Sequence, residues 1–99
     1  MTYESSRVLE KALQQRIMDT AKALGWLAYH THDARRSVPG FPDTCLVRGE
    51  RLVFAELKSE KGKVTVEQQQ WLDALEKVPG VECRVWRPAD LQDAIEFLR

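Results

Sequence analysis

Two short runs of strand-forming residues stand in the middle of the chain, separated by only two residues. The runs are Thr44–Arg48 and Arg51–Ala55, and the pair between them is Gly49-Glu50. A two-residue connection that begins with Gly is typical of a type II′ turn, which joins neighbouring antiparallel strands. The segment is therefore predicted to be a β-hairpin, and its turn fixes which residues of the two strands lie opposite each other.

The predicted register brings three ionisable side chains to one face of the hairpin. If Arg48 lies opposite Arg51, then Asp43 lies opposite Glu56. Directly opposed residues have Cβ atoms about 5 Å apart and project from the same face of the sheet. Lys58 lies two residues beyond Glu56 and therefore projects from that face as well.

Two carboxylates this close repel each other unless a positive charge lies between them, and a hard divalent cation with oxygen ligands is the usual solution. A bound Mg²⁺ can polarise a phosphoryl oxygen and orient the attacking group, while a nearby lysine stabilises the developing charge. This combination suits hydrolysis of a phosphodiester bond. The alternative is a surface hairpin with an ordinary Glu-x-Lys strand end, but the opposed Asp43, placed directly after Pro42, favours the metal site.

The motifs of this region resemble those of a known nuclease superfamily. Pro42-Asp43 followed by Glu56-Leu57-Lys58 resembles the PD-(D/E)xK nucleases. With Gly40-Phe41 before the first motif and Gln68-x-x-Trp71-Leu72 after the second, the order is similar to that of the VRR-NUC family, the virus-type replication-repair nucleases. The resemblance extends from about Glu10 to Trp86. It implies an α/β fold with a restriction-endonuclease-like core, a mixed β-sheet flanked by helices.

Periodic patterns along the chain predict the element order α-β-β-β-α-β-α. Apolar residues at helical spacing indicate a first helix from about Ser5 to Leu24, which Gly25 ends. Thr65-x-x-Gln68 is a capping-box pattern that opens a helix to about Val78. Both faces of the hairpin are apolar apart from the site residues, so we expect helices on both sides of the sheet. The other expected elements are strands at Trp26–Thr31 and Val81–Trp86, a loop at His32–Phe41, and a last helix from Pro88 to near Arg99. The three tryptophans, Trp26, Trp71 and Trp86, are expected in the core.

Two polar residues fall on the apolar stripes of these predicted helices. At 100° per residue, Glu10 lies within the arc of the first helix that carries Leu13, Ile17 and Ala21, and Gln68 lies within the stripe of the second. The resemblance implies that Glu10 reaches the metal directly or through water, and that Gln68 orients the lysine, a water or the substrate phosphate. The alternatives are a Glu10 carboxylate favoured by the helix dipole and a Gln68 that caps the helix.

Fifteen basic and fifteen acidic side chains cancel, so the composition offers no net attraction for nucleic acid. Basic residues nevertheless flank the predicted site, where they are candidates for contacts with DNA phosphates, with solvated loop charges as the alternative. These candidates are Arg35, Arg36 and His32 before Asp43, and Lys61 and Lys63 after Glu56.

The length of 99 residues predicts a single nuclease domain over residues 1–99. No apolar stretch is long enough for a membrane span and no signal-peptide pattern is present, so we expect a cytoplasmic protein, in the host cytoplasm if the chain is viral. Cys45 and Cys83 stand in β-like apolar runs and are expected to be reduced thiols. The chain contains no Gly-rich phosphate loop, so no nucleotide cofactor is expected.

Together these features predict a DNA endonuclease that depends on Mg²⁺ or Mn²⁺. In this hypothesis Asp43, Glu56 and the carbonyl of Leu57 bind the metal, and Glu10 assists. Lys58 orients the attacking water or stabilises the transition state, and Gln68 supports it. One or two metal ions are both compatible with the sequence.

The resemblance to small stand-alone members of the family implies cleavage of branched DNA, Holliday junctions in particular, by a homodimer. Paired cuts on symmetry-related strands also favour two subunits, because the chain carries one predicted site. The alternatives are a nickase, a flap nuclease or a restriction-type nuclease. A further alternative is a DNA-binding or interaction module on a nuclease fold, which would predict degenerate site residues, whereas Asp43, Glu56 and Lys58 are all present.

Overall fold

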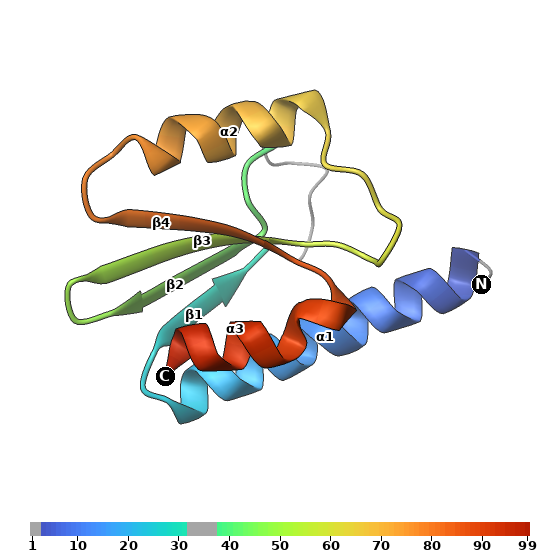
Figure 1. Ribbon diagram of the computed structural model, residues 1–99, viewed down its shortest axis with the longest axis horizontal. Helices are drawn as coiled ribbons and strands as arrows, with labels where there is room; N and C mark the ends of the chain where they lie inside the picture. Colours follow the sequence, from blue (N-terminus) through green and yellow to red (C-terminus); the bar gives the residue numbers. More distant parts are fainter. Residues whose placement is uncertain (1–2, 32–37) are drawn as a thin grey trace.

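A computed structural model describes residues 3–31 and 38–99, and in the first helix it describes side chains from Leu9 onward. This part of the chain forms a four-stranded sheet between helices (Figure 1). The element order agrees with the prediction, with one short 3₁₀ helix added before the last α-helix. The elements are α1 Tyr3–Ala23, β1 Leu27–His30, β2 Thr44–Arg48, β3 Arg51–Leu57, α2 Val66–Glu76, β4 Val81–Trp86, η2 Pro88–Asp90 and α3 Leu91–Leu98.

The sheet is mixed, with strand order β1-β2-β3-β4. The first three strands pair antiparallel, whereas β4 pairs parallel with β3 and is reached through the crossover helix α2. The predicted hairpin register is confirmed, because Arg48 lies opposite Arg51 and Cys45 opposite Phe54. Gly49 has a φ of 60° and no other residue of the turn has a positive φ, which is the pattern of a type II′ turn.

The helices α1 and α3 cover one face of the sheet (Figure 1). Apolar side chains of both helices and of three strands meet there and form the core. Its members are Leu13, Ile17, Ala21, Trp26, Leu46, Val53, Ala55, Leu57, Trp86, Ala94 and Leu98. The indole Nε1 of Trp26 donates to the carbonyl of Leu98 over 2.8 Å, so the one polar atom of this buried ring is satisfied.

The two arginines of the hairpin tie its turn to the ends of these helices. Arg48 donates to the carbonyls of Leu24 and Leu98, both at 3.0 Å, and Arg51 donates to the carbonyl of Phe97 at 3.3 Å. Carbonyl groups at the C-terminal ends of helices carry partial negative charge. The two opposed positive charges are therefore each stabilised by helix ends, and the turn end of the hairpin is fixed to the core.

The opposite face is covered less completely than the apolar pattern suggested. The helix α2 lies over this face on the side of β3 and β4 (Figure 1), so the expectation of helices on both sides is confirmed. Leu27, Tyr29 and Val47 project from this face on β1 and β2, and they are 76%, 62% and 36% exposed. Burial of the hairpin strands on both sides is thus wrong for β2.

Trp71 also departs from its expected core position. Trp26 and Trp86 are buried, whereas Trp71 on α2 is half-buried and packs against the loop before β2. The two cysteines are free, and burial raises the pKa of both thiols. Among the helices in the described part of the chain, none is both long and apolar enough to cross a membrane.

Candidate active site

Asp43 and Glu56 meet at the open end of the hairpin, away from its turn. The paired residues extend to Thr44 and Ala55, and the next position outward places Asp43 opposite Glu56. The backbone N–H of Asp43 donates to Glu56 Oε2 over 3.4 Å, and the backbone N–H of Leu57 donates to the Asp43 carboxylate. Each carboxylate is therefore held by the backbone of the other strand, and the two acids lie side by side.

Glu56 is buried, with 3% of its surface exposed, and it has two further polar neighbours. Gln68 Nε2 donates to Glu56 Oε1 over 2.6 Å, and Lys58 Nζ lies 3.8 Å from the same oxygen. The Lys58 side chain is only 15% exposed. The structure thus brings together four of the predicted site residues, two acids, one amine and one amide, at the ends of β2 and β3.

Burial is the main reason that both carboxyl groups hold their protons more tightly than usual. Desolvation raises the pKa of Asp43 to about 6. Desolvation, together with repulsion from Asp43, raises the pKa of Glu56 to about 7. Lys58 lowers both pKa values but does not cancel these effects. A divalent cation between the carboxylates would remove their repulsion, so the site favours cation binding.

Gln68 has both of the roles that the sequence left open. Its backbone N–H donates to Thr65 Oγ1 over 3.1 Å, and its side-chain Oε1 accepts from the backbone N–H of Thr65 over 2.8 Å, which completes the predicted capping box. Because the amide oxygen is held by the cap, the amide nitrogen is directed at Glu56. Gln69 bonds instead to Asp73, so only Gln68 of the three consecutive glutamines bonds to the sheet.

The loop that leads into Asp43 fits closely against the start of α2. Gly40 has a φ of 88°, a backbone conformation that favours glycine. A Cβ atom on Gly40 would lie within 2.7 Å of three atoms of Glu67, two of them backbone atoms. The glycine is therefore required twice, for its backbone conformation and for the close approach of the loop to the helix.

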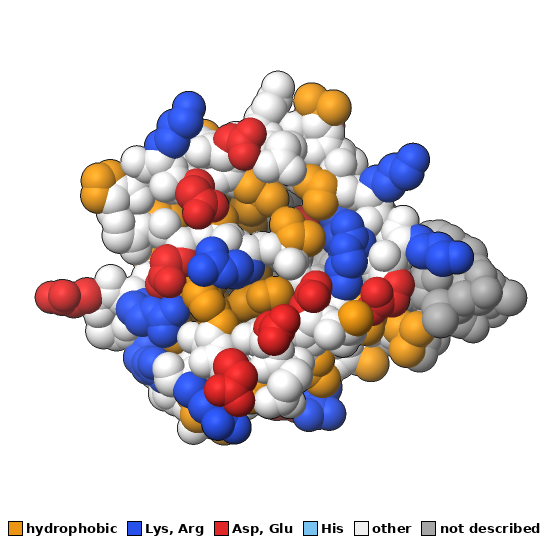
Figure 2. All heavy atoms as spheres, in the orientation of Figure 1, with side chains coloured by type: hydrophobic (Ala, Val, Ile, Leu, Met, Phe, Trp, Pro, Cys, Tyr) orange, Lys and Arg blue, Asp and Glu red, His pale blue; other side chains and the backbone are white. Residues whose placement is uncertain are grey.

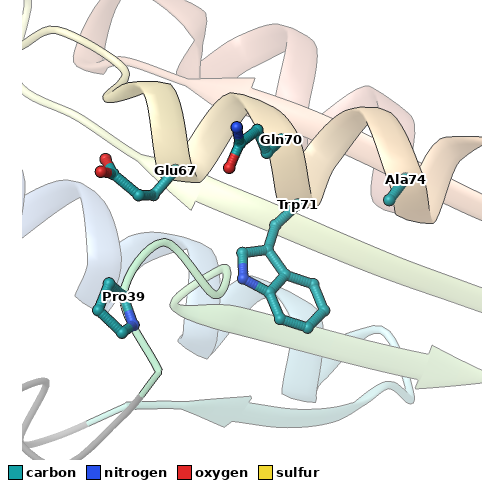
Figure 3. A pocket seen from close by; sticks show the side chains of 5 residues that line it. All are labelled: Pro39, Glu67, Gln70, Trp71 and Ala74. Carbon is teal, nitrogen blue, oxygen red and sulfur yellow. The ribbon is translucent and has the colours of Figure 1, made fainter.

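Phe41, the next residue, fixes the same loop through its ring. It packs edge-on against Phe54 of β3 at 5.8 Å between ring centroids, and against Trp71 of α2 at 5.0 Å. Figure 3 shows Trp71 pointing from α2 into the space between the helix and the strands, with Pro39 on the neighbouring loop. The position of Asp43 thus depends on packing between this loop, the hairpin and α2.

The loop after Lys58 is held from the other side by Arg87. Arg87 Nη1 donates to the carbonyl of Ser59 over 2.7 Å and to that of Gly62 over 2.6 Å. The backbone N–H of Lys58 donates to the carbonyl of Trp86 at the end of β4. The first residues of the loop that Lys58 begins are therefore held by the end of β4 and by Arg87, which restricts the position of the Lys58 side chain.

Comparison with known proteins agrees with this geometry. A family model described as the VRR-NUC domain matches residues 2–89 of the 99-residue chain. The chain belongs to the VRR-NUC family. A solved structure described as a VRR_NUC domain superposes with a TM-score of 0.68 and is 26% identical in sequence, over 88% of this chain and 94% of that chain. The search of curated proteins found no match. This VRR-NUC chain therefore carries a nuclease-type domain.

Glu10 lies near the carboxylate pair without joining it. It is half-buried on α1, and its charge contributes to the raised pKa of both Asp43 and Glu56. Within residues 3–31 and 38–99, no three Asp, Glu, His or Cys side chains form a group that could hold a metal ion. The binding of a metal by Glu10, directly or through water, stays a prediction.

The predicted DNA contacts of the VRR-NUC chain fall into two groups. Lys61 and Lys63 are exposed on the loop after Lys58. Arg35, Arg36 and His32 lie outside the described residues, so their contacts stay predictions. On the face in Figure 2, acidic and basic side chains are intermixed, in agreement with the zero net charge. A net attraction for DNA phosphates over that whole face is therefore not expected.

Two residues near the site were missed by the sequence reasoning. Thr44 is fully buried, and its Oγ1 donates to Asp43 Oδ1 over 3.2 Å. A signal for it exists, because Thr44 is a polar residue on the strand face that otherwise presents Leu46 and other apolar side chains. Arg87 has no comparable signal, since an arginine after a strand is most often a solvated charge.

Proposed function

We propose that this VRR-NUC chain is a divalent-metal-dependent endonuclease that hydrolyses DNA phosphodiester bonds at the Asp43–Glu56 pair. The pair itself carries the proposal: two carboxylates lie side by side, one of them buried, with an amine 3.8 Å from Glu56. Both pKa values are raised although Lys58 lowers them, so the protein alone compensates the two buried carboxylates only in part. Its oxygen donors suit Mg²⁺ or Mn²⁺.

Each side chain of the site has one role in this proposal. Asp43, Glu56 and the carbonyl of Leu57 hold the cation, and Glu10 assists through water. The bound cation supplies polarisation of a phosphoryl oxygen and a lowered pKa for the attacking water. Thr44 and Gln68 keep the carboxylate oxygens in position, because each donates a hydrogen bond to one of them.

Lys58 supplies positive charge where negative charge develops. During hydrolysis the oxygen of water bonds to phosphorus, one P–O ester bond breaks, and the leaving oxygen takes up a proton. The Lys58 ammonium group donates to a phosphate oxygen or to the attacking water during this step. Its side chain is largely shielded from solvent, which strengthens the interaction compared with a surface lysine.

We further propose that the substrate is branched DNA, Holliday junctions in particular, and that the working unit is a homodimer. A four-way junction requires two cuts on symmetry-related strands, and each copy of the described structure contributes one Asp43–Glu56 pair. The apolar patch of Leu27, Tyr29 and Val47 on the uncovered sheet face supports this proposal. Contact with a second copy would remove these side chains from water.

The experiment that tests the function compares end-labelled four-way junctions, flaps, nicked duplexes and linear duplexes, each with Mg²⁺ and with EDTA. We expect Mg²⁺-dependent cleavage that is faster on the junction than on linear duplex. Asp43→Asn, Glu56→Gln and Lys58→Met should each lose at least about 100-fold in rate while keeping the circular dichroism of the folded protein. Asp73→Asn, a change at an exposed acid of α2, is the matched control.

The outcomes separate the parts of the proposal. Full activity in any of the three site variants, or undiminished cleavage in EDTA, would contradict the site. Preferred cleavage of flaps or equal cleavage of all substrates would contradict junction selectivity alone. A parent protein that binds DNA but cleaves none of the substrates would be a binding module on a nuclease fold.

A further inference from the structure

A cavity lies along one flank of α1, outside the proposed active site. It has a volume of about 300 Å³. Its lining residues are Lys11, Gln14, Gln15, Met18 and Lys22 of α1, and His30 of β1. Helix positions three or four apart are neighbours on the surface, so the five α1 residues form one stripe. This stripe lies next to the buried stripe of Leu13, Ile17 and Ala21 that packs on the sheet, and its Met18 is buried as well.

The lining of this α1 cavity consists mainly of hydrogen-bond donors and positive charge. Lys11 and Lys22 are cationic, the glutamine amides donate through their nitrogens, and no acidic residue lines the cavity. Gln15 Nε2 donates to Asp19, outside the lining. Neither lysine has an ion-pair partner in the described part of the chain. In a chain of zero net charge, this is a local excess of positive charge that suits an anion.

Two elements connect this cavity to the carboxylate pair. On α1, Lys11 directly follows Glu10. On the sheet, His30 lies opposite Thr44, the residue after Asp43. From Lys11 to Lys22 the helix rises by roughly 16 Å, which is long enough to follow several successive phosphates of one DNA strand. One end of the cavity therefore lies next to the backbone segments that carry Glu10 and Asp43, and the cavity extends away from them along α1.

We propose that the α1 cavity binds backbone phosphates of the DNA strand that enters the active site. The proposal rests on the proposed function, because the ligand is part of the proposed substrate. Phosphate oxygens accept hydrogen bonds and carry negative charge, which matches lysine and glutamine donors. Backbone contacts fix the register of a strand without reading its bases. Lys11 and Lys22 are thus positioning residues and take no part in the bond cleavage.

The test measures DNA affinity as a function of salt in EDTA, where no cleavage occurs. The probes are a fluorescent linear duplex and a four-way junction, and the salt concentration runs from about 50 to about 200 mM. The plot of log affinity against log salt has a negative slope. Each of the replacements Lys11→Gln and Lys22→Gln should make this slope less steep by about 0.9. Lys11→Arg should restore the slope, and Lys77→Gln at the far end of α2 is the charge-matched control.

Cleavage assays with Mg²⁺ separate positioning from catalysis. The Lys11→Gln/Lys22→Gln double variant should need several-fold more DNA for half-maximal rate, with a saturating rate within about twofold of the parent. Asp43→Asn should show the reverse, a lost rate with an unchanged salt slope in EDTA. If the parent cleaves no DNA, the proposed function fails, yet the salt slopes still decide whether the cavity binds phosphates.

Three results would overturn the proposal. The first is a double variant whose DNA affinity and salt slope equal those of the parent. The second is a Lys77→Gln variant whose salt slope changes as much as that of Lys11→Gln or Lys22→Gln. The third is a double variant that no longer binds inorganic phosphate in calorimetry but keeps the DNA affinity of the parent. The last result would assign the cavity to a free phosphate ion. Both lysines are exposed, and Lys22 is the basic residue in the last turn of α1, so the substitutions should lower the melting temperature by only a few degrees, and loss of folding would not confuse the comparison.

Discussion

Glu56 is the buried centre of the proposed site, and its polar partners come from separate parts of the chain. Asp43 donates through its backbone from the start of β2, Gln68 donates from α2, and Lys58 follows two residues after Glu56. A buried carboxylate needs such partners, because each unmet interaction costs roughly 1–3 kcal/mol or more for a charged group. Replacing one partner should therefore alter the position or the pKa of the Glu56 carboxylate while the overall fold is kept.

The two hydrogen-bonding roles of Gln68 can be separated by mutation. Gln68→Ala removes both the bond to Glu56 and part of the cap, whereas Thr65→Ala removes only the side-chain cap and keeps the backbone N–H that holds the Gln68 amide. We expect Gln68→Ala to slow cleavage by about 10- to 100-fold. Thr65→Ala should lower the free energy of unfolding by about 1 kcal/mol with near-parent cleavage. Equal rates in the two variants would contradict a role for Gln68 at the site.

The raised carboxyl pKa values predict how stability changes with pH in the absence of metal. Folded Asp43 and Glu56 have pKa values of about 6 and about 7, above the ordinary values of 3.8 and 4.5. Between about pH 4 and pH 7 the folded state therefore binds more protons than the unfolded state. The contribution of this pair to stability is greatest below about pH 4 and is lost as the pH rises through 7.

Asp43→Asn removes one of the two repelling charges. In metal-free buffer at pH 8 we expect it to raise the free energy of unfolding by an amount on the order of 1 kcal/mol, allowing for partial exposure of the carboxylate. The gain should shrink towards pH 5, where the parent carboxyl groups are largely protonated. Urea unfolding at the two pH values measures both quantities. A variant that is less stable than the parent at pH 8 would argue against the repulsion.

At the scale of elements, the loop before β2 holds Asp43 in place through its contact with α2. Gly40→Ala would place a methyl group against the backbone of Glu67. Gly80→Ala is a matched control, because Gly80 has a similar φ of 84° and nothing within 4 Å of its Cβ position. We expect Gly40→Ala to lower the free energy of unfolding, measured with urea, by about 1–3 kcal/mol more than Gly80→Ala does, and to slow cleavage as well. Equal costs would show that the close contact with Glu67 is unimportant.

The elements that the sequence predicted well are those governed by local chemistry. The Gly49-Glu50 turn determined the hairpin register, and the capping box with its helical period determined the start of α2 and the direction of Gln68. Val81–Trp86 was predicted with both ends correct, because Pro-Gly and Arg-Pro pairs bound it. In each case a turn or a cap within a few residues decides the outcome.

The features that could not be predicted depend on where distant elements pack. The apolar pattern of the hairpin is the same whether or not a helix covers it. The exposure of Val47 and the half-burial of Trp71 could therefore be predicted only with knowledge of where α2 packs on the sheet. The partners of Arg48 are carbonyls more than twenty residues away. Glu10 was placed on the correct side of α1, but the sequence could not give its distance from the carboxylate pair.

For the whole molecule, the apolar patch of Leu27, Tyr29 and Val47 on β1 and β2 predicts self-association. A double variant, Leu27→Lys/Val47→Lys, should be monomeric in sedimentation experiments where the parent is a dimer, since two charges at a contact between copies are costly. On four-way junctions it should give single nicks in place of paired cuts. Val78→Lys, at an exposed apolar residue just after α2, is the control. A monomeric parent that still makes paired cuts would contradict the homodimer.

The central claim is that Asp43 and Glu56 together hold a divalent cation. Calorimetric titration with Mn²⁺ at about pH 6.5, where the pair still carries about one proton, measures this binding in the parent, in Asp43→Asn and in the control Asp73→Asn. We expect saturable binding with release of protons for the parent and the control, because both raised carboxyl pKa values must fall when the cation binds. We expect Asp43→Asn to lose this binding. Equal Mn²⁺ affinity in the parent and in Asp43→Asn would contradict the claim.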